Sequence, residues 1–235
     1  MEQTNLKAVI FDFDGVIADS ENLHFKAFEE IFRRYGFTLD RETYWKEFLG
    51  FTDLELFQEA AAKYGISYGT SYQNLISEKS EIFMDVVKTT STVYPTIKDF
   101  VCSLRESGIR CAICSGASML DIEIIFELDN ELTGNNLAAL FETIVTADDV
   151  SRGKPDPEGY LLAGSRLRKS DESLKNSDCL VIEDSSWGLM AAKAAGMKTL
   201  AVTNSYPGEI LEQHAELVAP QLTPELIPQM KKIFG

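Results

Sequence analysis

The sequence VIFDFDGV at residues 9–16 decides the fold of this 235-residue chain. Three apolar residues lead into Asp12, and Asp14 and Gly15 follow. An apolar run that ends in polar residues and a glycine is typical of a buried β-strand that runs into a loop. Open α/β sheets bind ligands at the carboxyl ends of their strands, so the stretch predicts two carboxylates at a binding site. Carboxylates this close repel each other and need a cation or a shared proton. The alternative interpretation of the stretch is a strand followed by a plain Asp-Gly turn.

Four further strand patterns follow along the chain and alternate with helical patterns. The predicted strands comprise residues 7–12, 109–115, 143–146, 179–183 and 198–202. Such alternation is typical of an α/β fold in which helices flank a parallel sheet. The carboxyl ends of parallel strands meet at one edge, so the polar residues that end these strands are expected to converge.

An insertion separates the first two predicted strands. Residues 20–90 contain at least three helical patterns and no convincing strand, although a parallel connection normally uses one helix. The first pattern ends at Gly36, the second runs from Asp53 to Tyr64, and the third spans residues 72–87.

These patterns predict two structural units. A small all-α helical bundle at residues 19–92 is inserted into an α/β core made of residues 1–18 and 93–235. The chain would pass between the two units through hinges near residues 18–21 and 89–94.

Two later segments add polar residues to the predicted edge. Ser115 follows a predicted strand, and with adjacent backbone N–H groups, such as that of Gly116, it could hold a phosphate oxygen. The alternative for Ser115 is a plain helix N-cap. Lys154 lies in a Gly-Lys-Pro loop, where Pro155 stiffens the backbone and aims the ammonium group.

Adjacent acids end the predicted strand at residues 179–183. Glu183 and Asp184 cannot both point inward along a strand, but one can reach a site directly and the other through a water molecule. This arrangement suits Mg²⁺, a hard cation that keeps several waters when it is bound.

Composition excludes several functional classes. The chain is 45% hydrophobic and 25% charged, which is a globular composition. Its 37 acidic and 22 basic residues give a net charge of −15, which argues against a nucleic-acid binder. The N-terminus has no basic region of the signal-peptide kind, and no apolar stretch approaches the roughly 18 residues of a membrane span. We therefore expect a cytoplasmic protein without a membrane partner.

The chain has four cysteines, at positions 102, 111, 114 and 179. Cys111 and Cys114 have C-x-x-C spacing, but they fall in a predicted strand, where residues three apart point to opposite faces. A zinc site would need two more ligands, and the chain has only two histidines. We therefore predict core cysteines and no redox or zinc site.

In order and spacing, the four polar segments resemble the haloacid dehalogenase superfamily, in its β-phosphoglucomutase-like phosphatase branch. The matching motifs are DFDGV at residues 12–16, the Ser115 strand end, GKPDP at 153–157 and EDSSWG at 183–188. The resemblance implies a Rossmann-like core with a helical cap inserted after the first motif. It also implies a Mg²⁺-dependent phosphomonoesterase that acts on a small phosphorylated metabolite, above all a sugar phosphate, as a monomer or small homo-oligomer.

The resemblance also implies a role for each motif residue. Asp12 would attack phosphorus and form an aspartyl phosphate, and Asp14 would act as general acid and base. Asp12, the backbone carbonyl of Asp14, and Asp184 would bind Mg²⁺, with Glu183 bound directly or through water. Ser115, Gly116 and Lys154 would hold the phosphoryl oxygens.

Two alternatives stay open. Mutases of this branch are expected to carry an arginine in the cap loop, and residues 50–53 (GFTD) contain no basic residue. However, His24 matches a mutase histidine that links cap closure to the general acid. Lys79 could meet a distal anion, or it could be a snorkelling lysine whose stem covers apolar surface. The other alternative is a non-catalytic phosphometabolite-binding protein on the same scaffold.

Overall fold

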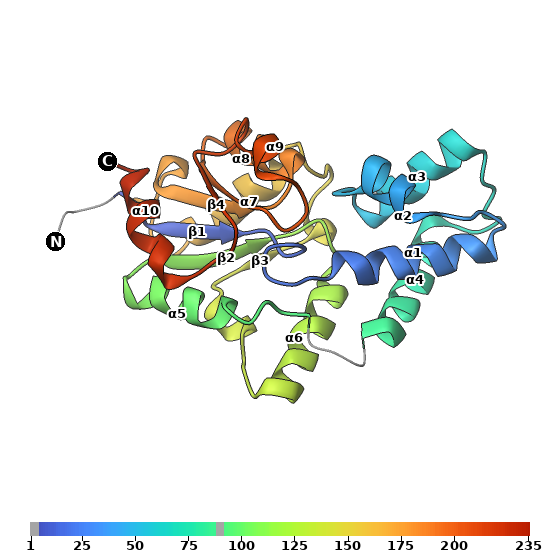
Figure 1. Cartoon of the computed structure of the whole chain (residues 1–235), viewed down its shortest axis with the longest axis horizontal. Helices are drawn as coiled ribbons and strands as arrows, with labels where there is room; N and C mark the ends of the chain where they lie inside the picture. Colours follow the sequence, from blue (N-terminus) through green and yellow to red (C-terminus); the bar gives the residue numbers. More distant parts are fainter. Residues whose placement is uncertain (1–4, 88–91) are drawn as a thin grey trace.

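The computed structural model describes residues 5–87 and 92–235, and within them lies one six-stranded, all-parallel sheet. The strand order is β3-β2-β1-β4-β5-β6, so the strand that precedes Asp12 lies near the centre (Figure 1). This confirms the predicted α/β fold, although the last strand was not predicted. The strands are β1 (Ala8–Phe11), β2 (Arg110–Cys114), β3 (Ile144–Val145), β4 (Cys179–Glu183), β5 (Lys198–Val202) and β6 (Leu217–Ala219).

Helices cover both faces of the sheet. Helices α5, α6 and α10 contribute to the apolar core on one face, and α7 and α8 contribute to the core on the other. The helices of this part of the chain are α5 (Ile97–Glu106), α6 (Met119–Thr133), α7 (Glu158–Arg168), α8 (Ser186–Ala194), α9 (Gly208–Leu211) and α10 (Ile227–Lys232). Short 3₁₀ turns, which are labelled η, occur at η2 (Ala138–Leu140), η3 (Ala147–Asp149), η4 (Asn176–Asp178) and η5 (Pro224–Leu226).

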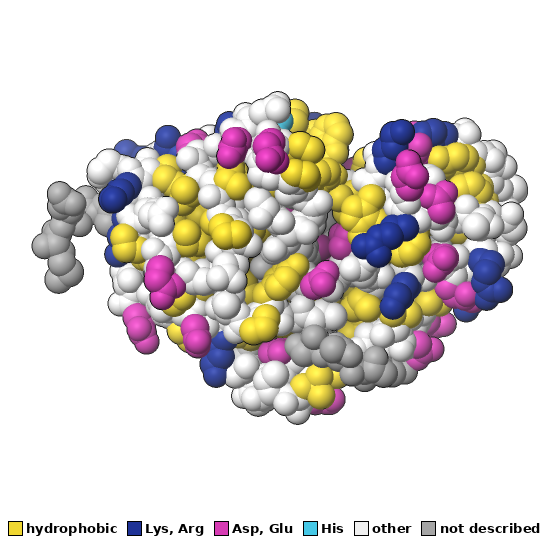
Figure 2. Space-filling view, viewed as in Figure 1, with side chains coloured by type: hydrophobic (Ala, Val, Ile, Leu, Met, Phe, Trp, Pro, Cys, Tyr) yellow, Lys and Arg dark blue, Asp and Glu magenta, His cyan; other side chains and the backbone are white. Residues whose placement is uncertain are grey.

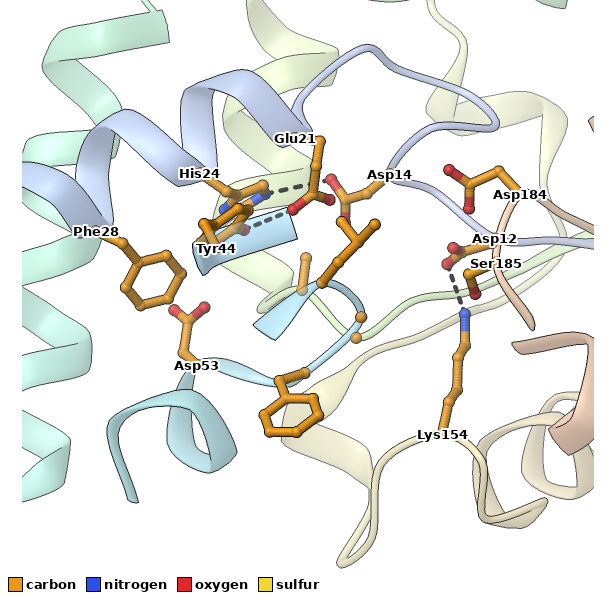
Figure 3. A pocket seen from close by; sticks show the side chains of 15 residues that line it. Asp12, Asp14, Glu21, His24, Phe28, Tyr44, Asp53, Lys154, Asp184 and Ser185 are labelled. Atoms are coloured by element: carbon orange, nitrogen blue, oxygen red, sulfur yellow. Dashed lines mark hydrogen bonds and ion pairs between the residues drawn. The ribbon is translucent and has the colours of Figure 1, made fainter. Parts of the chain in front are cut away.

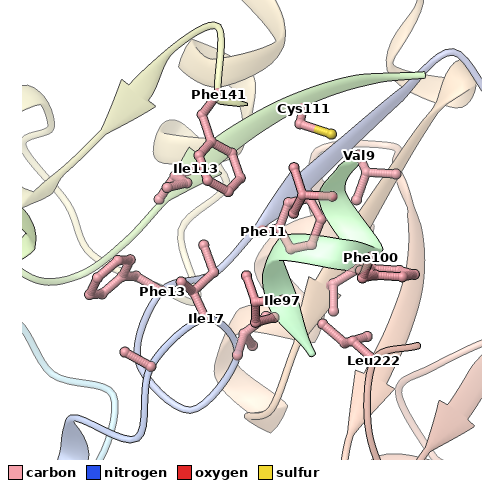
Figure 4. Close-up of a cluster of buried hydrophobic side chains, with 14 of the residues drawn as sticks. Val9, Phe11, Phe13, Ile17, Ile97, Phe100, Cys111, Ile113, Phe141 and Leu222 are labelled. Atoms are coloured by element: carbon pink, nitrogen blue, oxygen red, sulfur yellow. The ribbon is translucent and has the colours of Figure 1, made fainter. Parts of the chain in front are cut away.

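Strand β1 is buried on both faces, which explains its uninterrupted apolar sequence. Val9 and Phe11 pack into the first core, where Phe11 meets Phe100 of α5 edge to face (Figure 4). Ala8 and Ile10 alternate with them and pack into the second core. The central strand therefore holds its carboxyl end in a fixed place.

The cysteines follow the same alternation. Cys111 packs into the first core and Cys114 into the second, as the prediction of opposite faces requires. All four are free thiols; Cys102 is half-buried and the other three are buried. Burial raises the pKa of both Cys111 and Cys114 to about 12, so neither is a reactive thiolate.

A helical segment lies between β1 and α5 and stands beyond the carboxyl ends of the strands (Figure 1). It has an aromatic-rich core of its own, which includes Phe28, Phe32 and Phe57. Three of its helices match the predicted patterns, while α2 and the π-helical turn η1 were missed. The segment comprises α1 (Glu21–Arg34), α2 (Arg41–Thr43), η1 (Tyr44–Phe48), α3 (Asp53–Tyr64) and α4 (Tyr72–Val87).

Local signals explain the bounds of α3. Thr52 and Glu55 form a capping box, because the Thr52 side chain accepts from the backbone of Glu55 and the Glu55 carboxylate accepts from the backbone of Thr52. Gly65 then ends the helix in the left-handed conformation, with φ of 68°.

The two segments that join the helices to the sheet pair with each other where they are described. The backbone N–H of Asp19 donates to the carbonyl of Thr92 at 2.7 Å, and that of Tyr94 donates to the carbonyl of Ile17 at 3.0 Å. The predicted hinge at residues 18–21 lies here. Residues 89–91 of the second predicted hinge lie outside the described residues.

Acidic side chains are spread over the face shown in Figure 2, on the sheet-bearing part and on the helical segment alike. They do not gather into one surface there, which is consistent with charge that favours solubility. No helix within the described residues has the length and apolar character that crossing a membrane requires.

Candidate active site

Asp12 and Asp14 leave the sheet side by side at the end of β1. Asp12 directly follows Phe11, and the intervening Phe13 turns into the core. Gly15 has φ of +74°, and its N–H donates to the carbonyl of Ala18 at 2.8 Å, which closes a tight loop. Both carboxylates therefore line one pocket of about 610 Å³, a volume that includes its open mouth (Figure 3).

Lys154 reaches two carboxylates from the loop before α7. Its Nζ lies 2.7 Å from Oδ1 of Asp12 and 2.7 Å from Oε1 of Glu183. Burial would lower the pKa of Lys154, but the two carboxylates hold it well above its ordinary value. The lysine therefore stays charged beside Asp12.

Glu183 is fully buried, with 0% of its surface exposed, and protein donors surround its carboxylate. Oε1 accepts from Lys154 and, at 2.9 Å, from the hydroxyl of Tyr160. Oε2 accepts from the backbone N–H groups of Asp184 and Ser185, each at 3.0 Å, and from the Ser185 hydroxyl at 2.8 Å. Glu183 thus fixes the ammonium group of Lys154.

Gly188, in the first turn of α8, leaves the space that Glu183 occupies. A Cβ atom at this position would lie 1.6 Å from Oε1 of Glu183. We expect Gly188→Ala to lower the free energy of unfolding by about 3 kcal/mol, since a fully bonded buried carboxylate cannot move aside. Chemical denaturation measures this loss.

Gly208→Ala is the matched control, because a Cβ there would lie 3.6 Å from its nearest neighbour, Cγ2 of Thr203. We expect that variant to stay within about 0.5 kcal/mol of the parent protein. Equal losses in the two variants would contradict the packing assigned to Gly188.

Asp184 lines the pocket on the side of Asp12 that is opposite to Lys154 (Figure 3). Its carboxylate accepts from the hydroxyl of Ser205 and lies against Gly15, where a Cβ would come within 1.8 Å of Oδ2. The pKa values of Asp12 and Asp184 are both raised well above the ordinary value for aspartate. Burial is the largest cause, and the charge of Glu183 is the second.

Asp12, Glu183 and Asp184 can together hold a divalent cation. One carboxylate oxygen from each lies within 4.8 Å of the other two. The set offers oxygen ligands only, which suits a hard cation such as Mg²⁺. Because these buried like charges repel each other, a bound cation would stabilise their ionised forms. Since Glu183 already accepts several hydrogen bonds, Asp12 and Asp184 are the carboxylates best placed to bind it.

Asp14 is held from the side of the helical segment. Its Oδ1 accepts from the hydroxyl of Ser20 and lies 3.2 Å from Nε2 of His24, and its Oδ2 lies 3.4 Å from the hydroxyl of Ser115. Burial would raise the pKa of Asp14, but the contacts with His24 and Ser20 lower it to about 2. Asp14 is therefore ionised in the protein without substrate.

Lys79 does not snorkel, because its side chain is 0% exposed. Its Nζ lies 3.1 Å from Asp53, 3.1 Å from Asp121 of α6, and 2.8 Å from Nδ1 of His24. An ammonium group can only donate, so Nδ1 of His24 accepts this bond and Nε2 carries the proton that faces Asp14. Lys79 thus fixes the histidine tautomer from behind the pocket.

The structure brings most of the predicted site residues together. Asp12, Asp14, His24, Lys154 and Asp184 line the pocket, as does Gly116. Glu183 and Ser115 lie behind this lining. Ser115 is not the N-cap of α6, because Ser118 caps that helix; instead its hydroxyl accepts from the N–H of Ala117 at 3.0 Å.

Several residues of the pocket were not predicted from the sequence. The helical segment contributes Phe28, Tyr44 and Asp53 at the far end of the pocket, and Glu21 next to Asp14 (Figure 3). Of these four, Glu21 alone has a sequence signal, because the stretch Asp19-Ser20-Glu21 comes shortly after the DFDGV motif. Tyr44 begins a π-helical turn, for which the sequence has no periodic pattern.

Comparisons with known proteins show which proteins this chain is similar to. The model of the haloacid dehalogenase-like hydrolase family matches residues 9–202. The chain is 28% identical to the validoxylamine A 7′-phosphate phosphatase of Streptomyces hygroscopicus subsp. limoneus, over 92% of this chain and 94% of that protein. It is also 28% identical to the β-phosphoglucomutase of Bacillus subtilis, over 86% and 85% of the two chains. A crystal structure of CbbY from Rhodobacter sphaeroides in complex with phosphate covers 94% of this chain and 96% of its own, with a TM-score of 0.81 and 26% identity.

Proposed function

We propose a function for this chain, which belongs to the haloacid dehalogenase-like hydrolase family and is a phosphoric monoester hydrolase. It hydrolyses a small phosphorylated sugar in two steps, through an aspartyl phosphate on Asp12, and it requires Mg²⁺. The main support for this proposal is the position of the Asp12 carboxylate, which lies at the pocket wall, 2.7 Å from the ammonium of Lys154.

Asp12 attacks the phosphorus atom, and the bond to the leaving oxygen breaks. Lys154 reduces the repulsion between this carboxylate and the phosphate dianion, because its charge lies against the attacking oxygen. The hydroxyl of Ser115, 3.4 Å from Oδ2 of Asp14, and the backbone of Gly116 in the pocket lining hold the phosphoryl oxygens.

Asp14 moves the proton in both steps. It is ionised in the free protein, and the arriving phosphate dianion raises its pKa so that it takes up a proton. Asp14 then protonates the leaving oxygen and later accepts a proton from the water that attacks the aspartyl phosphate. The contacts with Ser20 and His24 hold the carboxyl group of Asp14 in place for these proton transfers.

Asp12, Asp184 and the backbone carbonyl of Asp14 would hold Mg²⁺, and Glu183 would position Lys154. The cation neutralises the charges of the carboxylates and of the phosphate when it is bound. The helical segment acts as a cap that covers the strand ends and excludes water from the reaction.

Removal of the metal tests the cofactor. We expect EDTA to lower phosphate release from sugar phosphates by about a hundredfold, and added Mg²⁺ to restore it. The measurement is inorganic phosphate released from a panel of sugar phosphates, with a mock-dialysed sample as the control. Activity that survives EDTA would rule out the metal requirement.

A phosphomutase is the second candidate, which the likeness to β-phosphoglucomutase and the contact between His24 and Asp14 favour. The same panel separates the two functions. Interconversion of hexose phosphates without net release of phosphate would support the mutase, whereas stoichiometric phosphate release supports the hydrolase.

A further inference from the structure

The end of the pocket remote from Lys154 is built by the helical segment. Figure 3 shows Asp12, Asp184 and Lys154 at one end and Phe28, Tyr44 and Asp53 at the other. A phosphoryl group bound beside Lys154 therefore directs the rest of its ester toward this far end.

Glu21, which lies between Asp14 and Tyr44 in Figure 3, offers an unused acceptor on the way to this end. The Tyr44 hydroxyl donates to Oε1 of Glu21 at 2.5 Å, whereas no side chain among residues 5–87 and 92–235 donates to Oε2. Tyr44 is itself buried and packs against the rings of Phe25 and Phe28, so it holds Glu21 in place. Glu21 can thus accept a hydrogen bond from a ligand without rearranging.

No lysine or arginine among the described residues balances Glu21 on the pocket lining. Among the described residues, Lys154 is the one lysine or arginine in the pocket lining, and it is paired with Asp12 at the opposite end. Lys79 lies behind the lining, where its ammonium contacts both Asp53 and Asp121. The lining that the helical segment supplies therefore combines acidic acceptors with the apolar surfaces of Phe28 and Phe51.

We propose that Glu21, oriented by Tyr44, makes the pocket specific for phosphate monoesters whose leaving group is uncharged and carries hydroxyl groups. The hydroxyl groups donate to Glu21, and the carbon chain lies against the phenylalanine rings. A second phosphate or a carboxylate on the leaving group meets Glu21 and Asp53 and is repelled. This specificity rests on the proposed function above, and it names the substrate class that the site selects.

Two matched pairs of monoesters test the specificity. Glycerol 3-phosphate is compared with 3-phosphoglycerate, and sorbitol 6-phosphate with 6-phosphogluconate; in each pair a carboxylate replaces one hydroxymethyl group. We expect kcat/KM to be about tenfold or more higher for the neutral member of each pair. Equal or faster hydrolysis of the carboxylates would overturn the proposal.

Substitutions test the role of Glu21. In Glu21→Gln the preference for the neutral member is expected to fall about fivefold or more. The control is Glu29→Gln, which removes one charge from an exposed position of the same helix and should keep the preference of the parent protein. Tyr44→Phe, which removes the donor that orients Glu21, should also reduce the preference. An unchanged preference in both Glu21→Gln and Tyr44→Phe would contradict the assignment.

A binding measurement separates this specificity from the proposed reaction. Titration calorimetry of the same four esters on the Mg²⁺-treated Asp12→Asn variant reports the preference without turnover. If the parent protein releases no phosphate even from p-nitrophenyl phosphate, the proposed function fails, and the dissociation constants alone decide the specificity. Tighter binding of the neutral esters supports it, and equal binding overturns it.

Discussion

Asp12→Asn is expected to lower kcat by about 10⁴-fold, the largest effect of any single substitution in the site. The asparagine keeps the size of the side chain but cannot attack phosphorus as a carboxylate does. Phosphate release from the best substrate of the panel, measured at saturating concentration with Mg²⁺, gives the effect. The loss should appear in kcat, because the variant keeps the other groups that contact the phosphate.

The stability of the same variant shows whether the loss is chemical. The raised pKa of Asp12 indicates that its charge is unfavourable in the metal-free protein. The Asp12→Asn protein should therefore unfold no earlier than the parent protein when Mg²⁺ is absent, and Mg²⁺ should stabilise it less. A marked fall in melting temperature, or a retained kcat, would count against the role given to Asp12.

Lys154→Met should have the second largest effect, with kcat/KM lower by about 10³-fold. Methionine fills the same volume, but it removes the cation that separates Asp12 from an incoming phosphate. It also leaves the fully buried Glu183 without its charged partner, so we expect a lower melting temperature. Steady-state kinetics and thermal unfolding measure the two effects.

The matched control is Lys193→Met, at an exposed position of α8 outside the pocket. It changes the net charge by the same amount and should alter kcat/KM less than about twofold. Similar losses in the two variants would mean that the overall charge of the chain, rather than the place of Lys154, governs attraction of the phosphate.

Much of the fold could be predicted because it follows from local patterns. The bounds of β4 and β5 agree with the prediction, and those of α3 and α4 lie close to it, since each has a continuous apolar run or stripe. Strand β6 was missed because it has three residues, of which two are only half-buried, so it has no strong apolar run. The turn η1 was missed because a π-helix does not repeat with the helical period.

Sequence patterns placed the strand-end residues of the site but not their partners. Asp12, Asp14 and Asp184 could be expected at one edge because each follows a buried strand. The contacts of Lys79 with Asp121, 42 positions away, and of Tyr160 with Glu183 depend on how the helices pack. The hydrogen bonds that surround the Glu183 carboxylate likewise depend on packing, so its proposed contact with a metal, directly or through water, stays a prediction.

If a phosphoryl group passes through Asp12, it can be trapped on that side chain during turnover. In Asp14→Asn, p-nitrophenyl phosphate, whose leaving group needs no proton, should still phosphorylate the protein, while hydrolysis of the aspartyl phosphate slows. Quenching during turnover with Mg²⁺, reduction with borohydride and peptide mass spectrometry then locate the acyl phosphate as homoserine. We predict homoserine at position 12. A burst of p-nitrophenol with Asp12 unmodified, or homoserine at another position, would contradict the account.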